Sequence, residues 1–90
     1  MYAVPVSATF TDRAVADAGL DEVVAQISSL PGFVTGYWVV LSPTTGTSLI
    51  VFDSGETAQD FVDLLVTAPD IPGVMIDRDS LAVGEVVAHV

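Results

Sequence analysis

Few residues of this 90-residue chain could take part in chemistry, and the most prominent are two adjacent aromatic residues, Tyr37 and Trp38. They lie in the stretch PGFVTGYWVV, residues 31–40. Consecutive side chains of a strand point to opposite faces of a sheet. We therefore expect one ring to face the helices and the other to face an interface. An aromatic ring in a pocket suits a flat ligand, and Tyr or Trp can also donate a hydrogen bond. Plain packing in the core or interface is the competing interpretation.

The titratable groups offer weaker candidates. Glu85 and His89 share one face of a predicted strand, and a carboxylate can orient a histidine base. Two pleats separate them, roughly 13 Å, so we expect no direct pair and an exposed His89. Arg78 lies between Asp77 and Asp79. It could form an ion pair across strands or subunits, or hold an anionic group of a ligand.

Four acidic residues repeat at helical spacing in the second half of the chain: Asp53, Glu56, Asp60 and Asp63. Such a row could bind a hard cation weakly. It also lies opposite an apolar stripe, where an amphipathic helix faces water. We expect a solvated face and no metal site. Nucleophile-elbow, phosphate-loop and zinc-binding spacings are all missing, and there is no cysteine.

Composition narrows the class of protein. Hydrophobic residues make up 51% of the chain, and the mean hydropathy is +0.65. No apolar run approaches the roughly 18 residues of a spanning helix, and no signal peptide is recognisable. The formal charge of −10 makes nucleic acid and anionic membranes poor partners. We expect a soluble, cytoplasmic protein of one domain, residues 1–90, that hides apolar surface by self-association.

Periodicity predicts six elements. Apolar residues alternate over Tyr2–Phe10, which predicts a strand with Pro5 at a bulge or an unpaired position. Thr11 and Asp12 could cap the following helix, but Gly19 favours a regular helix that begins late, at Leu20. The remaining predicted features are a helix end at Pro31-Gly32, a strand Phe33–Leu41, a turn over Ser42–Thr47 and a strand Ser48–Phe52.

The C-terminal half completes the pattern. Asp53 is the expected N-cap of a second helix, with Glu56 three residues later. Its apolar stripe is Ala58, Phe61, Val62 and Leu65, and Pro69, Pro72 and Gly73 end it. Val74–Val90 reads as a last strand, kinked at Gly84.

This order predicts an α+β, ferredoxin-like βαββαβ fold with a four-stranded antiparallel sheet. Two helices cover one face of such a sheet. We expect the other face to pack on a second copy, forming a dimeric α+β barrel. A monomer with an exposed apolar sheet would be prone to aggregation.

The segments LPGFVTGYWVV, SLIVFDSGETAQDFVDLL and VGEVVAHV resemble the antibiotic biosynthesis monooxygenase-like family, in particular its small actinobacterial-type members. The resemblance covers nearly the whole chain. It implies a homodimer with pockets between each sheet and its helices, and oxidation of aromatic substrates or haem without a metal or flavin of the protein's own. Family members use Asn with Trp and His in the pocket. This chain has no asparagine, and its only Trp and His are Trp38 and His89.

Two functions stay open at this point. The first is a homodimer that binds an apolar or aromatic small molecule between sheet and helices, without catalytic residues or cofactor. The alternative is a cofactor-independent monooxygenase acting on an aromatic substrate. The candidate pocket residues are Tyr37, Trp38, Phe52, Phe61 and Arg78. Docking on another protein through the acidic helices is a third idea that no motif favours.

Overall fold

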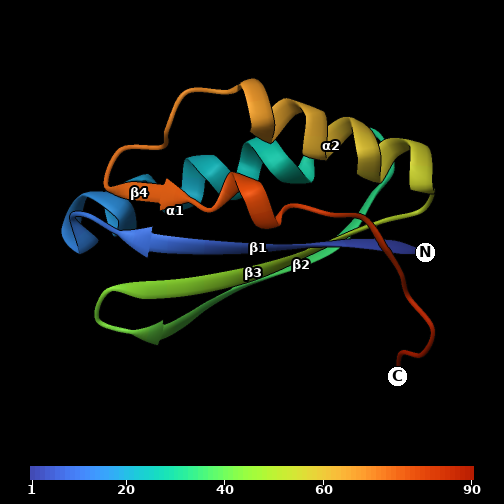
Figure 1. Ribbon diagram of the computed structural model, residues 1–90, viewed down its shortest axis with the longest axis horizontal. Helices are drawn as coiled ribbons and strands as arrows, with labels where there is room; N and C mark the ends of the chain where they lie inside the picture. The colour runs from blue at the N-terminus through green and yellow to red at the C-terminus, as the bar shows by residue number, and fades with distance from the viewer.

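The computed structural model describes residues 1–90 and places two helices on one face of an antiparallel sheet (Figure 1). The elements in chain order are β1 (Tyr2–Phe10), α1 (Arg13–Ser28), β2 (Phe33–Ser42), β3 (Thr45–Phe52), α2 (Gly55–Thr67), β4 (Val74–Ile76), a 3-10 turn η1 (Arg78–Ser80) and β5 (Gly84–Glu85). The strand order is β2-β3-β1-β4, and β5 also pairs with β1. The predicted ferredoxin-like α+β fold is confirmed.

The edge of the sheet beyond β1 is broken, and Pro5 lies where it breaks. β1 pairs with β3 in one unbroken register from Tyr2 to Thr9, so Pro5 forms no bulge; of the two predicted alternatives, the structure shows the unpaired position, on the opposite edge of β1. The amide of Phe10 points towards the β3 side and the carbonyl of Ser7 towards the β4 side. By this alternation the nitrogen of Pro5 faces the gap between β4 and β5. Pro5 has no amide hydrogen to donate, and it lies at a position where no neighbouring strand would accept one.

The predicted strand Val74–Val90 is therefore wrong in its length. β4 has three residues, η1 follows, and β5 has two residues. The chain leaves the edge after Asp77, whose amide donates to the carbonyl of Ser7. Arg78 then reaches over to α2, which holds η1 away from the ladder.

Helix α1 begins at Arg13, not at Leu20 as predicted. The carboxylate of Asp12 accepts the amide of Val15 and caps the first turn. Arg13 and Asp17 add an ion pair one turn apart. A glycine inside a helix costs only about 1 kcal/mol, so Gly19 does not delay the start of a capped helix.

Two other predicted boundaries move by a few residues. The N-cap of α2 is Ser54 instead of Asp53, and its hydroxyl accepts the amide of Thr57. β3 begins at Thr45 instead of Ser48, because the hydroxyl of Ser42 accepts the amides of Thr44 and Thr45 and tightens the hairpin. Neither shift changes which residues face the helices.

The buried core joins the sheet to α2 alone. Its members are Val4, Val6, Ile50 and Phe52 from the sheet and Ala58, Phe61 and Val62 from α2. The predicted apolar stripe of α2 is thus confirmed, with Leu65 packed at its margin. α1 has one buried residue, Ala16, among its 16. The helical layer is therefore tightly packed under α2 and loosely packed under α1.

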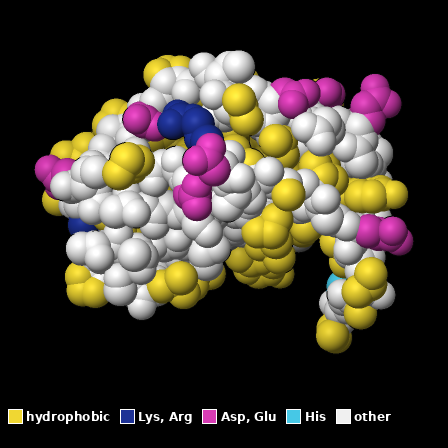
Figure 2. All heavy atoms as spheres, viewed as in Figure 1, with side chains coloured by type: hydrophobic (Ala, Val, Ile, Leu, Met, Phe, Trp, Pro, Cys, Tyr) yellow, Lys and Arg dark blue, Asp and Glu magenta, His cyan; other side chains and the backbone are white.

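The opposite face of the sheet is apolar and uncovered. Tyr37 is 61% exposed, and Val39, Leu49 and Met75 on the same face are each at least 40% exposed. Figure 2 shows hydrophobic side chains along this lower side of the molecule, whereas acidic ones stand over α2. The C-terminal segment leaves the body on this side as well (Figure 1). None of the helices is long and apolar enough to cross a membrane.

Two glycines give opposite predictions for the same substitution. Gly73 has φ of +78°, and an added Cβ would clash with the carbonyl of Asp12 at the start of α1. Gly19 has open space around it. Gly73→Ala should lower the free energy of unfolding by about 2 kcal/mol. Gly19→Ala should raise it by about 0.5–1 kcal/mol. Urea denaturation measures both, and two effects of the same sign would contradict this assignment of α1.

Candidate functional site

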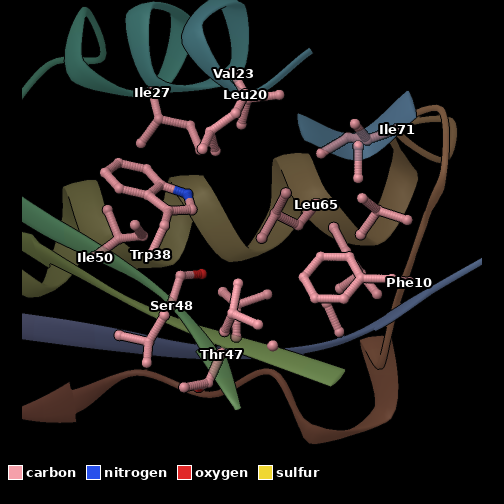
Figure 3. Close-up of a pocket in the computed structure, with 18 of the residues that line it drawn as sticks. Phe10, Leu20, Val23, Ile27, Trp38, Thr47, Ser48, Ile50, Leu65 and Ile71 are labelled. Carbon is pink, nitrogen blue, oxygen red and sulfur yellow. The ribbon is translucent and has the colours of Figure 1, made fainter. Parts of the chain in front are cut away.

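A cavity of about 140 Å³ lies between α1, α2 and the helical face of the sheet, partly open to solvent (Figure 3). Hydrophobic side chains form 16 of its 20 lining residues. The lining consists of Val6, Ala8, Phe10, Ala16, Asp17, Leu20, Val23, Ile27, Trp38, Val39, Val40, Gly46, Thr47, Ser48, Ile50, Phe61, Leu65, Ile71, Val74 and Ile76.

The cavity lies beneath the apolar face of α1, which the sheet covers only in part. Leu20, Val23 and Ile27 form its apolar face, and all three line the cavity. Leu20 is still 39% exposed. Protein interiors are normally packed without voids larger than a water molecule. The chain itself therefore buries the apolar face of α1 only in part, with Ile27 packed at the margin of the core.

Trp38 forms the wall opposite α1. Its ring lies over Gly36, because a Cβ added there would come within 2.9 Å of the indole. Phe10 lies over Gly46 in the same way at the other end, at 2.7 Å. Any larger residue at Gly36 or Gly46 would displace a ring. In Figure 3 the indole lies next to Ile27, on the side of the cavity that α1 borders.

Polar groups in the lining are few. Asp17 sits at the rim with its side chain 58% exposed and paired to Arg13. Thr47 and Ser48 come from β3, and Ser48 is the cross-strand partner of Trp38. No hydrogen bond within the chain uses the indole N–H of Trp38 or the hydroxyl of Ser48. These two groups are free to bond a ligand.

The aromatic candidates are spread over three places. Trp38 and Phe61 line the cavity, and Tyr37 lies on the uncovered face of the sheet, so the two neighbours do face opposite ways. Phe52 is fully buried and packs between Phe33 and Phe61. It also borders a smaller hollow of about 70 Å³ beside Leu30 and Pro31.

Arg78 holds the C-terminal end of α2. Its guanidinium donates to the carbonyl of Leu65 at 3.0 Å and to that of Ala68 at 2.9 Å. It also pairs with Asp70 at 2.9 Å. These carbonyls have no partner within the helix, and a cation is favourable at this end of the helix dipole. Arg78 thus fixes the end of α2 from which Leu65 enters the cavity.

The remaining titratable candidates do not converge. Asp53, Glu56, Asp60 and Asp63 are all exposed. No three His, Cys, Asp or Glu side chains lie close enough together to hold a metal ion. His89 is in the exposed C-terminal segment after β5 and does not line the cavity.

Several lining residues were not singled out from the sequence. Phe10 and Ser48 fall on predicted strands, and Leu20, Val23 and Ile27 fall within the predicted first helix, but the sequence assigns none of them to a pocket. Helical periodicity identifies an apolar face but does not give its distance from the sheet. The one clue in the sequence is Gly36, which lies two residues before Trp38 and therefore on the same face of the strand.

Comparison with solved structures shows the same fold in MhuD, a heme-degrader from Mycobacterium tuberculosis. The structure with two hemes bound in its active site matches with a TM-score of 0.54 and 19% identity, over 98% of both chains. A mutant of MhuD with two manganese protoporphyrin IX per active site matches with a TM-score of 0.54 and 20% identity, over 98% of this chain and 97% of that one. The heme-free form matches with a TM-score of 0.50 and 21% identity, over 99% of this chain and 96% of that one.

No model of a known protein family matches the chain, and no curated protein does either. The likeness to MhuD therefore establishes the fold and agrees with the fold that the sequence resemblance implied. It leaves the activity of this chain to be argued from its own residues.

The contacts of Arg78 predict a stability effect that a matched variant can isolate. Arg78→Met should lower the free energy of unfolding by about 2 kcal/mol, because it removes charge-assisted hydrogen bonds to two helix carbonyls. Arg13→Met removes an exposed ion pair and one contact with Phe10, and should cost less than about 1 kcal/mol. Thermal or urea denaturation measures both. Equal losses would show that Arg78 has no special role at the end of α2.

Proposed function

We propose that this protein is a homodimer that binds an apolar or aromatic small molecule in the cavity between α1 and the sheet. One observation carries the proposal, namely that the apolar face of α1 and the ring of Trp38 line the same largely apolar cavity. A ligand between them would complete a core that the chain leaves unfinished.

The energetics favour an apolar ligand. Each 40 Å² of apolar wall that a ligand removes from water contributes about 1 kcal/mol. The indole offers a flat surface for stacking. The free N–H of Trp38 can donate a hydrogen bond to a ligand, and the hydroxyl of Ser48 can donate or accept one. Ligand pockets commonly combine apolar walls with a few such polar groups.

The fold neighbours support a small-molecule site. MhuD holds two hemes, or two manganese protoporphyrins in the mutant, in its active site. Those ligands are flat and aromatic in character. The neighbours therefore support binding of a flat molecule by this fold, whereas the choice of molecule depends on the side chains of each chain.

The lining favours binding over turnover. A monooxygenase that uses no cofactor needs a group that takes a proton from its substrate. The only carboxylate of the lining, Asp17, is half exposed and paired to Arg13 at 2.8 Å. No histidine lines the cavity. The monooxygenase alternative would require Trp38 and Ser48 to carry the chemistry, so unchanged turnover of an oxidisable aromatic by Trp38→Phe would remove Trp38 from such a mechanism.

The uncovered sheet face supports the homodimer. Tyr37, Val39, Leu49 and Met75 present an apolar surface on one flat side of the sheet. Contiguous apolar surface of this kind marks an interaction site on a folded protein. A second copy brings the same surface, and two such sheets face to face form the proposed barrel.

Filling the cavity should block binding. Val23→Phe places a ring in the space facing Trp38 and should raise the Kd of 1-naphthalenemethanol at least about tenfold. Ala25→Phe adds the same ring on the exposed side of α1 and should leave the Kd unchanged. The chain has a single tryptophan, so the one indole N–H signal in a ¹H–¹⁵N NMR spectrum reports the cavity directly. Equal Kd values for the two variants would place the ligand elsewhere.

A charge on the sheet face should separate the dimer. Leu49→Glu would bury an unpaired carboxylate in the proposed interface and should yield a monomer. Val66→Glu places the same charge on α2, on a side chain that is 52% exposed against 40% for Leu49, and should remain dimeric. Native mass spectrometry distinguishes the two masses. A monomeric unsubstituted protein would exclude the homodimer.

A further inference from the structure

The walls of the cavity carry no positive charge. Its four lining residues that are not hydrophobic are Asp17, Gly46, Thr47 and Ser48. Lysine, arginine and histidine do not occur among the lining residues. The only formal charge in the lining is therefore negative.

Both arginines of the chain already bind other groups of the protein. Arg78 is bound to the carbonyls of α2 and to Asp70. Arg13 lies at the rim, paired with Asp17 at 2.8 Å and 5.2 Å from the centre of the Phe10 ring. There is no lysine, and the chain carries a formal charge of −10. An anionic ligand would find no free cation near the cavity.

From this charge distribution we propose that the cavity takes an uncharged or cationic aromatic molecule of about one or two fused rings and rejects carboxylates. The inference rests on the proposed function and names its ligand class. Burying a carboxylate without a partner is costly. A cation at the rim is favoured by the field of the acidic surface, Asp17 included, and it can also lie against the aromatic face of Trp38.

The size of the cavity sets the number of rings. An engineered cavity of about 150 Å³ in another protein admits benzene. A cavity of about 140 Å³ that opens to solvent can take a second ring at its mouth. A porphyrin, with four pyrrole rings around its metal, is larger than the one or two rings that this space takes.

The donor set of the lining does not fit heme either. Proteins hold heme iron through His, Cys, Met or Tyr side chains. None of these four residue types lines the cavity. Tyr37 and Met75 lie on the other face of the sheet, His89 is in the exposed C-terminal segment, and there is no cysteine. The two carboxylates of heme also lack a cation here. In ligand chemistry this chain therefore differs from the heme-binding proteins that share its fold.

The preference for an uncharged or cationic ligand over a carboxylate is called the charge rule below. Three derivatives of the same naphthalene ring test it: 1-naphthylmethylamine, 1-naphthalenemethanol and 1-naphthoate. Titration of each against the indole N–H signal of Trp38 gives three Kd values. We expect the amine to bind as tightly as the alcohol or tighter, and the carboxylate to bind at least about tenfold more weakly than the amine at low salt. The ratio should shrink as salt is added.

A matched pair of variants localises the effect. Asp17→Asn removes the carboxylate at the rim and frees Arg13, so the ratio of carboxylate to amine Kd should fall at least about threefold. Asp63→Asn changes the net charge equally on the exposed side of α2 and should leave the ratio within about twofold.

The outcomes separate this inference from the proposed function. Binding of the alcohol with a carboxylate that binds equally well or tighter would overturn the charge rule and leave the binding function intact. A saturable, stoichiometric Soret shift with hemin, abolished by Val23→Phe but not by Ala25→Phe, would also overturn it. Failure of all three naphthalenes to shift the Trp38 signal would overturn both.

Discussion

The structure depends on how unequally the two helices cover the sheet. α2 seals the half of the sheet centred on Phe52, where Ala58, Phe61 and Val62 are buried. α1 is anchored at its first turns by Asp12 and Ala16 and packs Ile27 at the margin of the core, but it leaves a cavity beside Leu20 and Val23. Where two apolar faces are not in contact, the residues that line the space between them lose the stabilisation of burial and of dispersion contacts. The cavity, the aromatic wall and the proposed ligand all follow from that gap.

The same shortage of coverage appears on the other side of the sheet. A 90-residue chain with only two helices cannot cover both faces of a sheet. The apolar residues around Tyr37 form the surface that the proposed second copy would cover, and those around Trp38 form the wall that the proposed ligand would cover. The acidic surface over the helices keeps a positively charged group near the cavity favourable and an anionic one unfavourable.

Sequence periodicity predicted the fold well because strand alternation and helix stripes are local. Tyr2–Phe10 and the stripe of α2 were predicted with the correct faces. The start of α1 was missed because the cap at Asp12 outweighs one internal glycine. The last strand was predicted too long because the contacts of Arg78 with α2 join residues 10 and 13 positions apart. The cavity could not be predicted, since a pattern of apolar residues does not reveal whether two apolar faces touch.

A crystal structure of the protein grown with 1-naphthalenemethanol tests the central claim most directly. The account predicts density for the naphthalene ring between the indole of Trp38 and the Val23 face of α1, with the hydroxyl within hydrogen-bond distance of Ser48 or the indole N–H. An empty site with α1 closed onto the sheet, its apolar face packed against Trp38, would contradict the claim that the chain leaves this core unfinished.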